Sequence, residues 1–128
     1  MAYYFSKILN VSFEEAISKV TDELKKEGFG IITEIDVKET LKKKLNVDFR
    51  NYRILGACNP QYVYQAILIE DKVGTMLPCN VIVQEHAQGK VEVAAINPIA
   101  SMLAISNPEL RSVAEQVQAK LKKVIDDL

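Results

Sequence analysis

Three of the four prolines in this chain directly follow an asparagine, and this repeated pair limits where helices can begin. The pairs are Asn59-Pro60, Asn97-Pro98 and Asn107-Pro108. Asparagine is favoured at the position just before a helix, and proline at the first position inside it. The pairs therefore predict helices over residues 60–70, 98–105 and 108–128.

Two earlier segments also carry helix signals. Over residues 10–30, Ser12 and Glu15 form a capping box, apolar residues recur at helical spacing, and Gly28 supplies a stop. A shorter helix is predicted over residues 36–46, because a capping residue precedes a second apolar stripe. Its buried side is expected to consist of Val37, Leu41 and Leu45.

Segments rich in β-branched and aromatic residues lie between these helices and predict five strands. The strands are expected at residues 2–9, 29–35, 49–57, 79–85 and 90–96. The last two form a hairpin in which Gly89 supplies the turn. The sum is a single α+β domain of 128 residues with one antiparallel sheet and helices packed on one face. Its core order is β-α-β4-α, with short extra helices.

The closing helix carries apolar residues in alternating steps of four and three. They are Leu110, Ala114, Val117, Leu121, Val124 and Leu128, with Val113 and Ile125 beside them. This spacing suits either a coiled-coil seam with a second chain or a helix lying on a sheet. Because the stripe is wider than a coiled-coil seam, it favours packing within the chain.

The composition argues against several classes of protein. Sixteen Lys and Arg against seventeen Asp and Glu leave a formal net charge of −1, so no general field attracts nucleic acid or an anionic membrane. The N-terminus lacks the basic head and apolar run of a signal peptide, and no apolar stretch is long enough for a membrane span. Two cysteines are too few for a disulfide scaffold. We expect a cytoplasmic protein with reduced thiols.

Both cysteines are followed by an asparagine, as Cys58-Asn59 and Cys79-Asn80. Cys58 would end one strand and Cys79 would begin the next, so the sequence places both at one edge of the sheet. Three interpretations stay open: small buried hydrophobes, reactive or redox thiols led by Cys58, or ligands for a metal or cofactor. The only histidine, His86, is too far along the strand to complete a zinc site with Cys79.

Two arginines, Arg50 and Arg53, are candidates for binding a small anion beside the predicted helix start at Asn59. Alternation along the strand places them on opposite faces. Glu34 or Asp36 could pair with one of them, in which case that arginine would form a cross-strand salt bridge instead.

Laid out in full, GFGIITEIDVKETLKKKLNVDFRNYRILGACNP and LPCNVIV resemble the bacterial and archaeal family called domain of unknown function 302. The resemblance covers nearly the whole chain and is densest at residues 28–60 and 77–83. It implies the β-α-β4-α architecture, a relation to the TATA-binding-protein-like fold, and dimers. It implies no reaction.

These observations favour a homodimeric binding protein for a small molecule, with an anion as one candidate, without established catalysis. The predicted site consists of Cys58, Asn59, Cys79, Asn80, Arg50 and Arg53. The alternatives are a thiol-dependent redox or detoxification enzyme that uses Cys58, and a structural or partner-binding module. Nothing in the sequence names a cofactor or a metal, and a nucleic-acid partner is not expected.

Overall fold

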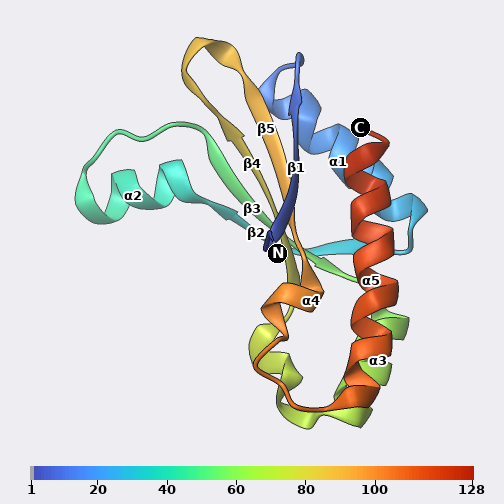
Figure 1. Cartoon of the computed structure of the whole chain (residues 1–128). Coiled ribbons are helices and arrows are strands. Elements are labelled where there is room, and N and C mark those ends of the chain that lie inside the picture. The colour runs from blue at the N-terminus through green and yellow to red at the C-terminus, as the bar shows by residue number, and fades with distance from the viewer. Residues whose placement is uncertain (1) are drawn as a thin grey trace.

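Five antiparallel strands form one sheet in the order β1-β5-β4-β3-β2, seen in Figure 1 for the computed structural model, which describes residues 2–128. The strands are β1 (Tyr4–Leu9), β2 (Gly30–Asp36), β3 (Tyr52–Cys58), β4 (Cys79–Glu85) and β5 (Val91–Ile96). Strands β4 and β5 form the predicted hairpin, whose turn has Gly89 at φ +70°. The predicted single antiparallel sheet in a β-α-β4-α order is confirmed.

Two long helices, α1 (Phe13–Lys26) and α5 (Pro108–Asp126), cover one face of this sheet (Figure 1). The Ser12 side chain caps α1 by accepting a hydrogen bond from the Glu15 amide, as the capping box predicts. The inward valines of the central strands β4 and β5 are fully buried against the two helices. They include Val81, Val83, Val91 and Val93.

The stripe of α5 packs within the chain. Its apolar residues are buried in the same hydrophobic core as those of α1 and the sheet, with Leu121 at 0% exposure. The coiled-coil alternative is therefore wrong, because the stripe has no free side to offer a second chain.

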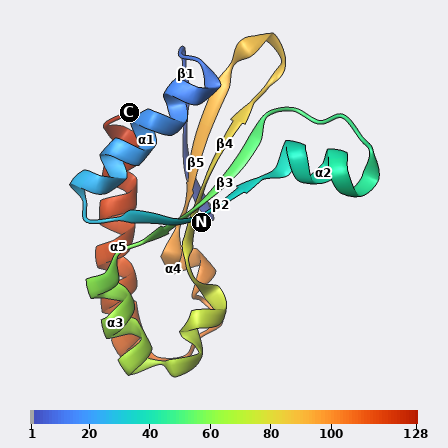
Figure 2. The same cartoon turned by 180° about the vertical axis from the view of Figure 1, so that it is seen from behind.

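The short helix α2 (Val37–Leu45) differs from its prediction. It begins at the Asp36 cap and ends at Asn46 in a left-handed conformation, but none of its residues is buried, and Leu45 is 66% exposed. Figures 1 and 2 show the reason: α2 projects beyond the sheet, away from α1 and α5, so no layer lies beneath its apolar side. The expected burial of Val37, Leu41 and Leu45 is wrong.

Three further helices lie below the sheet in Figure 1: α3 (Pro60–Ile69), the 3₁₀ helix η1 (Asp71–Met76) and α4 (Pro98–Ser101), whereas the short 3₁₀ helix η2 (Ala87–Gly89) lies in the β4–β5 turn. The predicted helix over residues 98–105 ends after one turn. Pro108 favours an extended residue before it, and Asn107 has φ −137° and ψ 104°, so the chain needs an irregular segment before α5 can begin. No helix within residues 2–128 combines the length and the apolar composition that a membrane span requires.

Strand β3 starts at Tyr52 and not at residue 49 as predicted. On one side its partner β2 runs only from Gly30 to Asp36, because the chain turns into α2 at that point. Residues 49–51 therefore have no neighbour on that side. They stay close to β4 through a bond from the Glu85 amide to the Asn51 carbonyl (3.0 Å).

Candidate functional site

The sheet divides the six residues of the predicted site between its two faces. Cys58 and Cys79 do lie at the same end of β3 and β4, since Ala57 is directly opposite Cys79 and Gly56 opposite Asn80. Side chains alternate along a strand, however, so Cys79 points to the helices, whereas Asn80 and Cys58 point to the open face. The six residues therefore do not form one pocket.

Cys79 is buried on the helix side, where it lines a cavity of only about 30 Å³. Such a space holds about one water molecule and excludes a metabolite. Burial, and secondarily the nearby Cys58, raises the pKa of the Cys79 thiol to about 11. Cys79 is therefore a protonated thiol at neutral pH and resembles the small buried hydrophobe among the three interpretations. Cys58 is half-buried.

Asn59 is at the start of α3, but its side chain does not cap that helix. Its Nδ2 donates to the carbonyl oxygen of Glu27, which ends α1, at 3.1 Å. The chain passes this point through Gly28 at φ +87°, where a Cβ atom would lie 3.1 Å from the same Nδ2. Asn59 thus joins the end of α1 to the start of α3, and the capping role predicted for its side chain is wrong.

Arg53 points to the helix side and is surrounded by carboxylates. Its guanidinium lies 2.9 Å from Glu34, 3.5 Å from Asp36 and 3.7 Å from Glu14, and it lies over the ring of Phe13. Its Nε is buried without a hydrogen-bond partner. Three anionic neighbours already compensate this charge, so Arg53 matches the salt-bridge alternative and is a poor anchor for an anion.

Arg50 has the opposite surroundings. Its side chain is exposed beside the open face, where Nε donates to Oε1 of Gln84 (3.0 Å) and the guanidinium lies 4.4 Å from the ring centre of Phe49. The ring of Tyr52 is 5.6 Å away. No carboxylate of the described residues forms an ion pair with it. Arg50 is therefore held in place while its charge remains uncompensated.

Gln84 connects Arg50 to the interacting pair Glu92 and His86. Its Nε2 donates to Oε1 of Glu92 (3.0 Å), and the same carboxylate oxygen lies 2.9 Å from Nε2 of His86. The orientation of the Gln84 amide is fixed from both sides, since its oxygen accepts from Arg50 and its nitrogen donates to Glu92. His86 is at the opposite end of β4 from Cys79.

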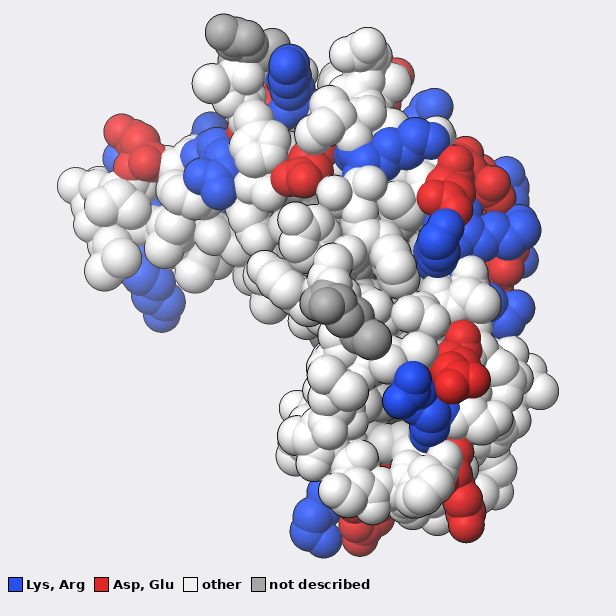
Figure 3. All heavy atoms as spheres, viewed as in Figure 1, with Lys and Arg blue, Asp and Glu red and all other residues white. Residues whose placement is uncertain are grey.

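A hollow of about 400 Å³ lies over these strands on the open face. Its lining comprises Tyr3, Tyr4, Tyr52, Asn80, Ile82, Gln84, Glu92, Ala94, Ala95 and Ile96. Figure 3 shows a recessed, almost uncharged surface between α2 and the lower helices, on the side away from α5. The lining combines an apolar floor with a few polar groups, which is typical of small-molecule sites.

Of the predicted set, only Asn80 lines the hollow. Arg50 lies next to it, because it donates a hydrogen bond to the lining residue Gln84. Cys58 is not part of the lining. The predicted set did not include Tyr52 and Gln84, which also line the hollow. For Gln84 a signal exists in CNVIVQE, where alternation alone places Asn80, Ile82 and Gln84 on one face. Among the described residues, no group of three His, Cys, Asp or Glu side chains is arranged to hold a metal ion.

Comparison with known proteins gives a family but no activity. The family model described as "Domain of unknown function DUF302" matches residues 5–128. A solved structure described as an uncharacterized conserved protein DUF302 from Bacillus stearothermophilus has 26% sequence identity and a TM-score of 0.91, with 98% of each chain covered. No curated protein matches the chain.

Proposed function

The chain belongs to the DUF302 family, and from this premise we propose that it binds a small anionic molecule on the open face of its sheet without catalysing a reaction of its own. The observation that carries the proposal is that the exposed, uncompensated guanidinium of Arg50 is bonded to Gln84, which lines the hollow of about 400 Å³. The site consists of Arg50, Tyr52, Asn80 and Gln84.

The surroundings of Arg50 favour a planar anion. Its Nε is used by Gln84, so the terminal nitrogens remain as donors for a carboxylate or phosphate. The aromatic rings of the lining and the apolar side chain of Ile82 offer a surface for a flat ligand body. Asn80 adds an amide that can donate and accept hydrogen bonds.

A thermal-shift titration with benzoate and with AMP tests this proposal. Both probes are planar anions, and we expect at least one to raise the melting temperature of the wild-type protein. Arg50→Met should weaken the binding about tenfold, because a hydrogen bond to a charged group is lost. The matched control is Arg53→Met, which removes a guanidinium from the other face and should leave the affinity unchanged. Equal binding by wild type and Arg50→Met would refute the site.

The structure gives less support to the thiol enzyme. The raised pKa of Cys79 removes one of the two thiols as a nucleophile, and Cys58 is only half-buried, outside the hollow. We therefore assign Cys79 to the core and leave Cys58, which lies outside the hollow, without a role in the proposed site. A cytoplasmic location is consistent with two free thiols.

We also propose that the protein is a homodimer and that its arm, residues 32–49, forms the interface. The arm carries four large apolar side chains that are between 42% and 66% exposed: Ile32, Ile35, Leu45 and Val47. Strand β2 is at the edge of the sheet, and the register shift between Ile31 and Thr33 leaves Ile32 61% exposed. An exposed edge with apolar side chains is suited to pairing with a second chain.

The total surface area supports an uncovered interface. The chain exposes 7526 Å², whereas a compact monomer of 14.4 kDa is expected to expose about 6,800 Å². The difference, about 700 Å², is close to the roughly 800 Å² that each partner of a standard interface buries. An arm that projects from the body accounts for this excess.

Light scattering at micromolar concentration tests the dimer. We expect wild type to be dimeric and Leu45→Glu to be monomeric, because the substitution places a charge among the exposed apolar side chains of the arm. Leu68→Glu is the matched control, since Leu68 is 69% exposed on α3 and lies outside the arm. A monomeric wild type, or a dimer that only Leu68→Glu dissociates, would refute this interface.

A nucleic-acid partner does not enter the proposal. The relation to the TATA-binding-protein-like fold that the family resemblance implies would concern architecture alone, and fold does not transmit function. The floor of the hollow on the open face is largely uncharged, whereas a nucleic-acid backbone binds to clusters of Lys and Arg side chains.

A further inference from the structure

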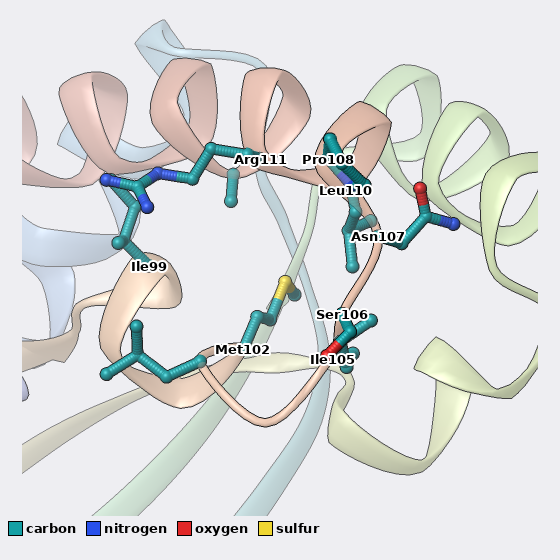
Figure 4. A pocket seen from close by; sticks show the side chains of 10 residues that line it. Ile99, Met102, Ile105, Ser106, Asn107, Pro108, Leu110 and Arg111 are labelled. Carbon is teal, nitrogen blue, oxygen red and sulfur yellow. The ribbon is translucent and has the colours of Figure 1, made fainter.

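A second hollow lies on the helical side of the molecule, between α4 and the first turns of α5 (Figure 4). Its volume of about 460 Å³ falls in the range of small-molecule sites. The hollow exists because α4 ends at Ser101. Residues 102–106 then run irregularly to α5 and form one wall of the hollow. The sequence-based helix over residues 98–105 gave no indication of this space.

The floor of this hollow is apolar and adaptable. Figure 4 shows Met102 extending into its middle, with Ile99 on one side and Ile105 on the other. Methionine is unbranched and polarisable, so it accommodates flexible apolar groups of different shapes. The floor therefore suits an aliphatic chain better than a rigid polar ligand.

Arg111 is the one charged residue among the described residues that line the hollow. It runs along the α5 side toward Ile99 (Figure 4), and its Nε lies 3.2 Å from Oε1 of Glu115, one turn further along the helix. The two side chains are 58% and 56% exposed, so their interaction is weak and easily exchanged. The planar guanidinium can then bind a carboxylate through two nitrogens.

We propose that this hollow binds an aliphatic monocarboxylate, with Arg111 holding the carboxylate at the rim and the chain lying on Met102 and Ile105. The site is separate from the one on the open face, because its residues come from α4, α5 and the segment between them. It needs neither Arg50 nor the hollow of β3–β5.

Methyl NMR of methionine-labelled protein tests the proposal with octanoate as the probe. The chain has three methionines, so the Met102 methyl signal is readily distinguished, and Met76 in η1 serves as an internal reference outside the hollow. We expect octanoate to shift the Met102 signal in a saturable manner and to leave Met76 in place. 1-Octanol, which lacks the charge, should bind about tenfold more weakly.

Two variants separate the head group from the chain. Arg111→Met keeps the apolar stem and should weaken octanoate binding about tenfold, without changing the binding of 1-octanol. Leu103→Glu adds a repulsive charge at an exposed position of the rim and should also weaken octanoate binding.

Arg50→Met should leave octanoate binding unchanged, so a failure of this proposal is distinguishable from a failure of the open-face site. A Met102 signal that does not move, or octanoate binding that Arg111→Met leaves intact, would overturn the proposal.

Discussion

Arg50 and Arg53 are close together in the chain, but the sheet gives them opposite surroundings. Arg53 points to the helix-covered face, where three carboxylates compensate its charge and its side chain is only 19% exposed. Arg50 lies beside the open face, where a neutral amide and two aromatic rings hold it. The comparison shows that the covered face compensates its arginine with three carboxylates, whereas the open face leaves the charge of Arg50 without an ion-pair partner among the described residues.

The largest expected effect compares an apolar residue of the covered face with one of the arm. Leu121→Ala should lower the free energy of unfolding by about 3 kcal/mol, because it leaves a cavity in a fully buried core. Leu45→Ala should change it by less than about 0.5 kcal/mol per monomer, since Leu45 is exposed. Urea unfolding at a concentration that keeps the protein monomeric provides the measurement. Similar losses for both variants would mean that α2 is covered within the chain.

A pH dependence follows from the burial of Cys79. Its pKa is raised from 9.0 to about 11, so below pH 9 the thiol is protonated in both the folded and the unfolded states. Between pH 9 and 11 the unfolded chain releases the proton first, and the free energy of unfolding should fall as the pH rises, by about 2 kcal/mol. Urea unfolding of wild type and Cys79→Ala across this range gives the difference. An equal fall in both would show that Cys79 is not its source.

The two arginines themselves should differ in stability. Arg53→Met removes the partner of Glu34, Asp36 and Glu14 and should cost about 1–2 kcal/mol, less than for a fully buried network because the carboxylates are partly exposed. Arg50→Met should cost less than about 0.5 kcal/mol. Unfolding at low and high salt checks the cause, since salt should reduce the Arg53 effect. A larger loss for Arg50→Met would reverse the comparison.

The smallest difference concerns two asparagines that each follow a cysteine. Asn59→Ala removes the bond to the Glu27 carbonyl and should cost about 1 kcal/mol, whereas Asn80→Ala on the open face should be close to neutral. Asn80→Ala should instead weaken binding of the open-face ligand. Chemical unfolding and the thermal-shift titration measure the two effects. If Asn59→Ala left the free energy of unfolding unchanged, the hydrogen bond that joins α1 and α3 would not stabilise the fold.

The sequence predicted the fold well where local signals and burial agree. Ser12 and Glu15 cap α1, Asn107 accepts a bond from the Glu109 amide at the start of α5, and Gly89 makes the turn of the hairpin. Each of these features depends on neighbours within a few residues. The stripe of α5 was also interpreted correctly, because its width matches the surface of a sheet.

The predicted grouping of the six site residues in one place was not found, because it required knowing which face each residue occupies. Placing Cys58 and Cys79 at the same edge followed from the order of the strands. Alternation then separates them, and the partners that decide their roles, such as Glu27 for Asn59 and Gln84 for Arg50, are distant in the sequence. The same holds for α2, whose apolar stripe predicted burial although no layer lies beneath it.

By itself the sequence determined most of the elements, their order and the face that the two long helices turn inward, because caps, turns and hydrophobic periodicity act over short distances. Only the tertiary structure decided which of two nearby arginines is neutralised, which asparagine joins two helices and where the hollows lie. Those properties depend on groups brought together across the sheet, and electrostatic compensation and cavity shape are set by such distant neighbours.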